Sequence, residues 1–206
     1  VIDDLGNLAS RRGDYEQAIV FHLREQEISL EAADLYSEFY AVIKLGEVSM
    51  LMERPTDAAL YYGRALKICR ELNDSRGLAQ TMITQAALLI QLHRSMEALG
   101  LLHEVIVLAW DIQNLDIVLR GLEMLVHSDV LDLNLDIRAR FAGALSHLSE
   151  RYSSASLPTE KEALVALKER LSREMDPSVF ALEWRIGRSY NWEQAVELAH
   201  ELIETG

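Results

Sequence analysis

The feature that most constrains this chain is a repeat of about 40 residues, at which short stretches of its sequence return. Leu5-Gly6-Asn7 is matched by Leu45-Gly46-Glu47 in the next repeat, and Ala18 returns as Ala58 and again as Ala98. A repeat of this length indicates a supersecondary unit that stacks on copies of itself. We expect the small residues that recur to lie where the two helices of one unit approach closely, since larger side chains would separate them.

The spacing of apolar residues within each unit is helical. They recur at three- and four-residue intervals, as in the set Tyr40, Ile43, Leu45, Val48, Leu51 and Met52. The 206 residues include only ten glycines and three prolines, so few positions interrupt long helices. We therefore predict an all-α chain, with helices at residues 2–12, 14–31, 35–53, 55–72, 76–93, 95–112, 116–132 and 135–151.

The period is lost after a short tract from Ser153 to Pro158. Beyond it, Thr159 and Glu162 have the spacing of a capping box, which begins a helix. We expect three helices between residues 159 and 204, forming an atypical cap on the last repeat. The predicted organisation is four helical hairpins over 1–152 (about 1–34, 35–74, 75–114 and 115–152), a linker at 153–158 and a C-terminal helical cap at 159–206.

The order Leu5-Gly6-Asn7 followed by Gly13-Asp14-Tyr15-Glu16-Gln17-Ala18 resembles the tetratricopeptide repeat (TPR), whose pattern covers about 34 residues. Later units keep fewer of the family's residues, namely Leu45, Gly46, Ala58 and Tyr62, then Ala86, Ala98 and Leu102. The longer period of this chain also overlaps that of HEAT and armadillo repeats, but these motifs favour TPR. The resemblance implies a TPR-type α-α superhelix, a right-handed solenoid of helical hairpins.

A narrower resemblance concerns the link from Glu71 to Gly77 and the tail. Long-period TPRs with the link Glu-Leu-Asn-Asp-Ser-Arg-Gly are typical of the sensor arms of bacterial signal-transduction ATPases, including LuxR-type and MalT-like transcriptional regulators. The segment from Phe180 to Ser189, followed by Trp192 to Val196, is similar to the C-terminal end of such arms. The resemblance implies that an ATPase and a DNA-binding domain lie outside this sequence, and we interpret the chain as part of a longer protein.

Charge and cysteine content exclude several classes of function. The formal net charge is −13, whereas phosphate binding needs clustered Lys and Arg, so we expect no direct contact with nucleic acid or with an anionic membrane surface. No run of 18 apolar residues indicates a membrane span. The single cysteine, Cys69, rules out an internal disulfide and fits a reducing compartment, so a cytoplasmic location is expected.

Motifs for catalysis and cofactor binding are missing from the sequence. It has no glycine-rich phosphate-binding loop, and His103-Glu104 lacks the second histidine of the zinc-protease motif. The six histidines fall at no ligand spacing, and the carboxylates follow helix faces and first turns. We therefore expect no enzyme activity, no cofactor and no metal ion.

Candidate binding residues follow from the resemblance, because the first helix of each TPR hairpin faces a concave groove that binds partners. Carried over by position, the groove residues are Asn7, Arg11, Tyr40, Ile43, Glu47, Met50, Gln80, Ile83, Ile90 and Arg120. Only Asn7 matches the carboxylate clamp of chaperone-adaptor TPRs, which disfavours that role. Tyr40, Ile43, Met50 and Ile83 instead predict an apolar strip suited to a partner helix. The alternative is that the chain's own cap, or a neighbouring repeat, covers this strip.

These observations favour a non-catalytic module for protein–protein interaction or effector sensing. The resemblance implies the regulatory C-terminal arm of a larger signalling ATPase or transcriptional regulator. Its partner would be a protein or peptide, such as a helix, or a small effector. The alternative is a free-standing TPR scaffold or adaptor that assembles partner proteins or forms a homo-oligomer.

Overall fold

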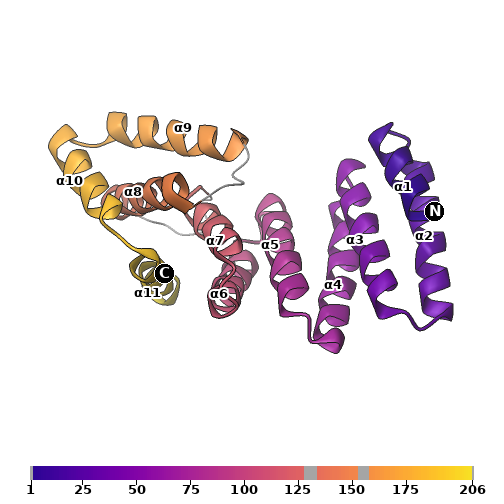
Figure 1. The fold of residues 1–206 in the computed structure, drawn as a ribbon. Coiled ribbons are helices and arrows are strands. Elements are labelled where there is room, and N and C mark those ends of the chain that lie inside the picture. The colour runs from indigo at the N-terminus through magenta and orange to yellow at the C-terminus, as the bar shows by residue number, and fades with distance from the viewer. Residues whose placement is uncertain (1, 128–133, 153–157, 206) are drawn as a thin grey trace. The chain divides into compact units, whose positions relative to one another are not determined.

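The computed structural model describes residues 2–127, 134–152 and 158–205, and within these ranges it consists of eleven helices and no strand (Figure 1). The prediction of an all-α chain is therefore confirmed. The helices are α1 (Ile2–Arg11), α2 (Tyr15–Glu31), α3 (Leu35–Leu51), α4 (Pro55–Leu72), α5 (Ser75–Gln91), α6 (Ser95–Asp111), α7 (Leu115–His127), α8 (Leu135–Tyr152), α9 (Pro158–Glu174), α10 (Pro177–Arg188) and α11 (Trp192–Thr205).

The helix boundaries follow the sequence closely. The first eight helices begin and end within two residues of the predicted positions, apart from the end of the seventh. Its predicted last residue, 132, lies outside the described residues. The region after 158 contains three helices, as predicted. Residues 153–157 of the predicted linker also lie outside the described part of the chain.

The chain forms two compact units, residues 1–88 and 89–206. In the first unit α1 packs against α2, α2 against α3 and α3 against α4. In the second unit α7 packs against α6 and α8, α9 and α10 pack against α8, and α11 contacts α6, α7 and α8. The boundary between the units falls within α5, so the cap helices share a unit with α6–α8 and are not a unit of their own.

The six turns from α1 to α7 have one design and recur at a constant spacing along the chain. One residue in each turn has a left-handed backbone, with φ between 53° and 82°, and these residues are Gly13, Ala33, Glu53, Asn73, His93 and Gln113. The next residue donates its N–H to the carbonyl five residues back, as Asp34 does to Ser29 at 2.8 Å. This is the Schellman turn, which satisfies carbonyls at a helix end. Two helix–turn segments of equal length therefore make up each repeat.

The residue after the left-handed position directly precedes the next helix, and in three of the six turns its side chain caps that helix. Asp34 accepts hydrogen bonds from the backbone N–H groups of Tyr36 and Ser37, and Asp74 accepts one from Gly77. Asn114 does the same for the helix α7. A hydrogen bond from the Ser37 hydroxyl, with help from these N–H groups, lowers the pKa of Asp34. Side-chain caps of this kind satisfy N–H groups that have no partner within the helix.

The contacts inside the hairpins involve small residues, as the sequence predicts. A Cβ atom on Gly46 would lie 2.5 Å from Cε1 of Tyr62, and one on Gly6 would lie 2.5 Å from Cε1 of His22. Ala18 and Ala58, the recurring alanines of the second helices, are completely buried. In each of these two hairpins a glycine of the first helix thus receives a ring from the second.

The helices α8 and α10 approach even more closely. A Cβ atom on Gly187 would overlap the carbonyl oxygen of Arg140, and one on Gly143 would lie 2.5 Å from the carbonyl oxygen of Trp184. Two ion pairs accompany this contact, Arg140 with Glu183 at 2.7 Å and Arg188 with Glu150 at 2.8 Å. Backbone contact and paired charges together hold α10 on α8.

The turn design predicts that Ala33→Gly stabilises the protein by about 0.5–1 kcal/mol, because a left-handed backbone costs an L-residue roughly 1–2 kcal/mol and costs glycine almost nothing. Ala32→Gly is the matched control, since Ala32 has φ −84° and glycine there gains nothing. Urea unfolding monitored by circular dichroism measures both changes. Equal effects of the two substitutions would contradict the role assigned to Ala33.

Candidate functional site

The first helices of the first unit, α1 and α3, carry six of the residues expected to bind a partner. Arg11, Tyr40 and Glu47 are exposed, and Asn7, Ile43 and Met50 are half-buried. Tyr40 is the most accessible large apolar side chain among them, with 58% of its surface exposed. Tyr36, one helical turn earlier on α3, is exposed to 56%. Two neighbouring aromatic side chains on α3 are therefore available to a partner.

Several of these six residues already have partners within the chain. The Asn7 amide donates a hydrogen bond to Oδ1 of Asp3 at 2.8 Å, and Glu47 pairs with Lys44 at 2.8 Å. Ile43 packs against the buried cluster that α3 and α4 form. Tyr40 is thus the best candidate for a direct contact, while Asn7 and Ile43 also have structural roles.

Ile83 corrects the sequence analysis. Its side chain is completely buried, so the expectation that it lies on an exposed strip is wrong. The reason is its position on α5, where Ala79, Met82, Ile83 and Ala86 form the buried stripe at helical spacing. Of the remaining expected residues, Gln80 is exposed, and Ile90 and Arg120 are half-buried.

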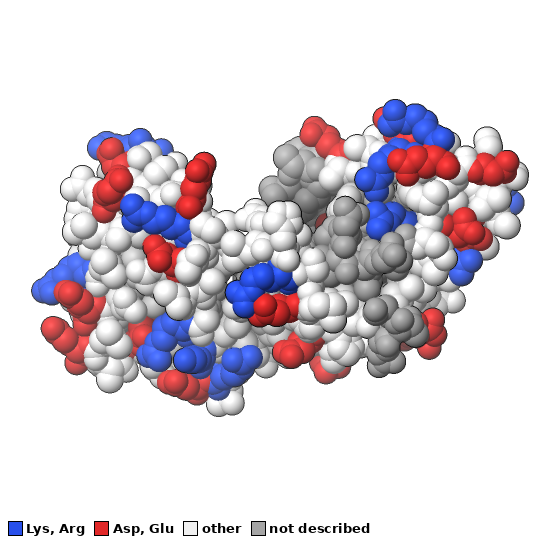
Figure 2. Space-filling view, turned by 180° about the vertical axis from the view of Figure 1, so that it is seen from behind, with Lys and Arg blue, Asp and Glu red and all other residues white. Residues whose placement is uncertain are grey.

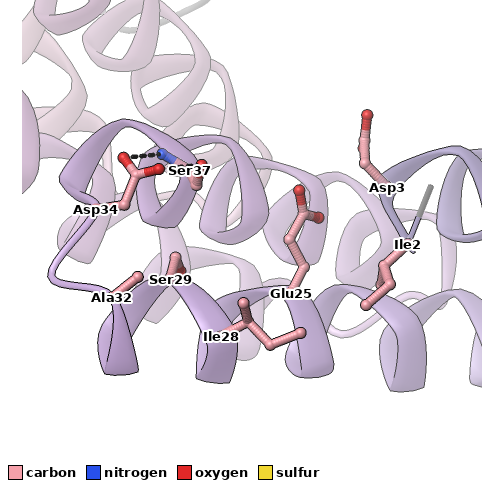
Figure 3. A pocket seen from close by; sticks show the side chains of 8 residues that line it. All are labelled: Ile2, Asp3, Glu25, Ile28, Ser29, Ala32, Asp34 and Ser37. Atoms are coloured by element: carbon pink, nitrogen blue, oxygen red, sulfur yellow. Dashed lines mark hydrogen bonds between the residues drawn. The ribbon is translucent and has the colours of Figure 1, made fainter.

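A pocket of about 360 Å³ opens in the first unit where α1, α2 and the start of α3 meet (Figure 3). Its lining combines apolar, acidic and hydroxyl-bearing side chains and consists of Ile2, Asp3, Glu25, Ile28, Ser29, Ala32, Asp34 and Ser37. Figure 3 shows the hydrogen bond between Asp34 and Ser37 at the edge of this pocket. The pocket therefore lies between the first helices of two successive hairpins, with α2 as its third wall.

Beside this pocket the hairpin of α1 and α2 brings together three residues that can bind a metal ion. Asp3, His22 and Glu25 place one potential ligand atom each within 4.8 Å of the others. The His22 side chain is completely buried, and its Nδ1 lies 3.3 Å from Oε2 of Glu25. Its other nitrogen, Nε2, is buried without a hydrogen-bond partner. The carboxylates of Asp3 and Glu25 reach the pocket.

The hairpin contact explains why these three side chains meet. Asp3 lies one turn before Gly6 on α1, and Glu25 lies one turn after His22 on α2. Because the His22 ring packs on Gly6, the two carboxylates are placed beside each other across the hairpin. In the second hairpin the same place is taken by Tyr62 on Gly46, where burial raises the pKa of the phenol to about 12.

The spacing of the histidines along the chain does not reveal this cluster. His22 and Glu25 are three residues apart, but Asp3 joins them only through the antiparallel packing of α1 on α2. A comparison between the repeats does distinguish these three positions. The equivalent residues of the second repeat, Ile43, Tyr62 and Ala65, contain no carboxylate and no imidazole.

The surface of the described residues carries acidic and basic side chains in interspersed groups, as one face shows (Figure 2). No helix in the described ranges has the length and apolar content that crossing a lipid bilayer requires.

A comparison with models of known protein families gives no match, and a comparison with curated proteins gives none either. The function is therefore inferred from the sequence pattern and the arrangement of side chains.

The difference between Tyr40 and Ile83 gives a direct prediction. Tyr40→Ala should change the free energy of unfolding by no more than about 0.5 kcal/mol, because the side chain is largely in solvent. Ile83→Ala should cost about 2–5 kcal/mol, because it leaves a cavity in a packed core. Thermal and urea unfolding of both variants measure the difference. A large loss for Tyr40→Ala, or none for Ile83→Ala, would contradict the assignment of the two faces.

Proposed function

We propose that this chain is a non-catalytic recognition module of the TPR type, which binds a protein or peptide segment on the first helices of its hairpins. The observation that carries the proposal is the pair of exposed aromatic residues on α3, Tyr36 and Tyr40, on the helix where the TPR resemblance places partner contacts. Tyrosine is enriched among residues that dominate binding energy, since it buries a large area with few rotatable bonds.

The chemistry of this face favours a partner with an apolar side. Tyr40 is exposed, and Ile43 and Met50 on the same helix are half-buried, so a partner helix would remove further apolar area from water. Arg11 and Glu47 at its border supply charges of both signs, which select orientation more than they add affinity. A helix or extended peptide fits this arrangement better than a polar small molecule does.

The proposed mechanism is regulation without chemistry. In the context that the resemblance to sensor arms suggests, the chain is the C-terminal arm of a larger cytoplasmic signalling ATPase or transcriptional regulator. A partner that binds the arm more tightly in one state of that protein shifts its equilibrium toward this state. The repeated helical hairpins support this proposal, since they provide a series of first helices on which a partner can bind.

Site-specific photo-crosslinking in the cell tests the proposal. A photoreactive amino acid replaces Tyr40 in the complete protein, and the control replaces Leu60, which is exposed to 71% on the second helix α4. Crosslinks to a distinct partner from position 40 but not from position 60 are expected. Introducing Tyr36→Asp, at an exposed position of the same face, should abolish them while circular dichroism shows unchanged helicity.

Other outcomes separate the alternatives. Crosslinks from position 40 to a second copy of this chain would favour the scaffold that assembles itself. Crosslinks to residues 159–204 of the same chain would show that the cap covers this face. Equal crosslinking from positions 40 and 60, or none from either, would contradict a recognition face on α3.

A further inference from the structure

We propose that Asp3, His22 and Glu25 form a binding site for a divalent transition-metal ion, with Zn²⁺ as the ion that fits best. The three side chains offer one ring nitrogen and two carboxylate oxygens within 4.8 Å of one another. Zn²⁺ accepts this set of ligands and leaves a fourth position for water. Its three ligands lie on α1 and α2, so this proposal does not depend on the proposed partner-binding face on α3.

Comparison with the other repeats shows what is particular to the first hairpin. In the second repeat the three positions hold Ile43, Tyr62 and Ala65, and in the third they hold Ile83, Leu102 and Val105. Four of these residues are completely buried, namely Ala65, Ile83, Leu102 and Val105. The first repeat thus has three metal-binding side chains at positions that later repeats use for packing.

The arrangement without an ion is unfavourable in two respects. A buried ring nitrogen with no hydrogen-bond partner, such as Nε2 of His22, loses its hydration without compensation. The carboxylates of Asp3 and Glu25 also repel each other at this distance. A divalent cation held by the carboxylates and one nitrogen of the imidazole would remove this repulsion.

The surroundings match those of a metal site. Asn7 donates a hydrogen bond to Oδ1 of Asp3, which fixes the carboxylate in the way that outer residues orient metal ligands. Asp3 and Glu25 also line the 360 Å³ pocket, so an ion and its water have access from solvent. Figure 3 shows the side chains of Asp3, from α1, and Glu25, from α2, at this pocket. Imidazole is a poor ligand for Mg²⁺ and Ca²⁺, which prefer oxygen, so these ions should bind weakly.

Titration calorimetry with ZnCl₂ on metal-free protein tests the proposal, with MgCl₂ and CaCl₂ as comparisons. We expect one Zn²⁺ per chain and an upward shift of the thermal midpoint with Zn²⁺ but not with Mg²⁺ or Ca²⁺. Asp3→Asn and Glu25→Gln should each weaken Zn²⁺ binding at least tenfold. Glu27→Gln is the matched control, since Glu27 is an exposed carboxylate on the same helix that pairs with Arg24, and it should leave Zn²⁺ binding unchanged.

His22→Tyr separates loss of the site from loss of the fold. The second hairpin accommodates tyrosine at this position against Gly46, so the variant should stay folded and bind no Zn²⁺. The pair of His103 and His200, whose ring nitrogens lie 2.8 Å apart in the second unit, is the competing site. Zn²⁺ binding that survives His22→Tyr and is lost in His200→Ala would overturn the proposal, as would the absence of stoichiometric binding.

Discussion

In the hairpins α1–α2 and α3–α4 a ring from the second helix packs on a glycine of the first, and this contact sets the geometry of the first unit. Gly6 receives His22 and Gly46 receives Tyr62, at distances that a β-carbon would make too short. This contact fixes how far one helix slides along the other, because a shift would place the ring against a larger side chain. Every side chain one turn away, including Asp3 and Glu25, takes its position from it.

Most of the fold could be predicted from the sequence, because the information is local and repeated. The constant offset between repeats, the recurring alanines and the helical spacing of the apolar residues placed the helices. The left-handed turns were not predictable at Ala33, Glu53, His93 and Gln113, because an L-residue with a β-carbon adopts that backbone only at a cost. There the length of the repeat and the packing of the helices impose the turn.

The candidate site depended more on tertiary structure. Position within the repeat correctly indicated that Tyr40 is accessible, but it did not show that Ile83 lies in the buried stripe of α5, since both helices have similar periodicity. The cluster of Asp3, His22 and Glu25 requires the register of α1 on α2, which spacing along the chain does not reveal. The same hairpin contact that permits a tyrosine in one repeat therefore brings a metal-binding set together in another.

A double-mutant cycle on Gly46 and Tyr62 tests most directly whether this ring-on-glycine contact sets the hairpin. Gly46→Ala alone should destabilise the protein by about 1–3 kcal/mol, because the new methyl group meets the Tyr62 ring. In the background of Tyr62→Ala, which removes that ring, the same substitution should cost about 0.5 kcal/mol or less, so the two effects are coupled. Equal costs of Gly46→Ala in both backgrounds, measured by urea unfolding, would contradict the role of this contact.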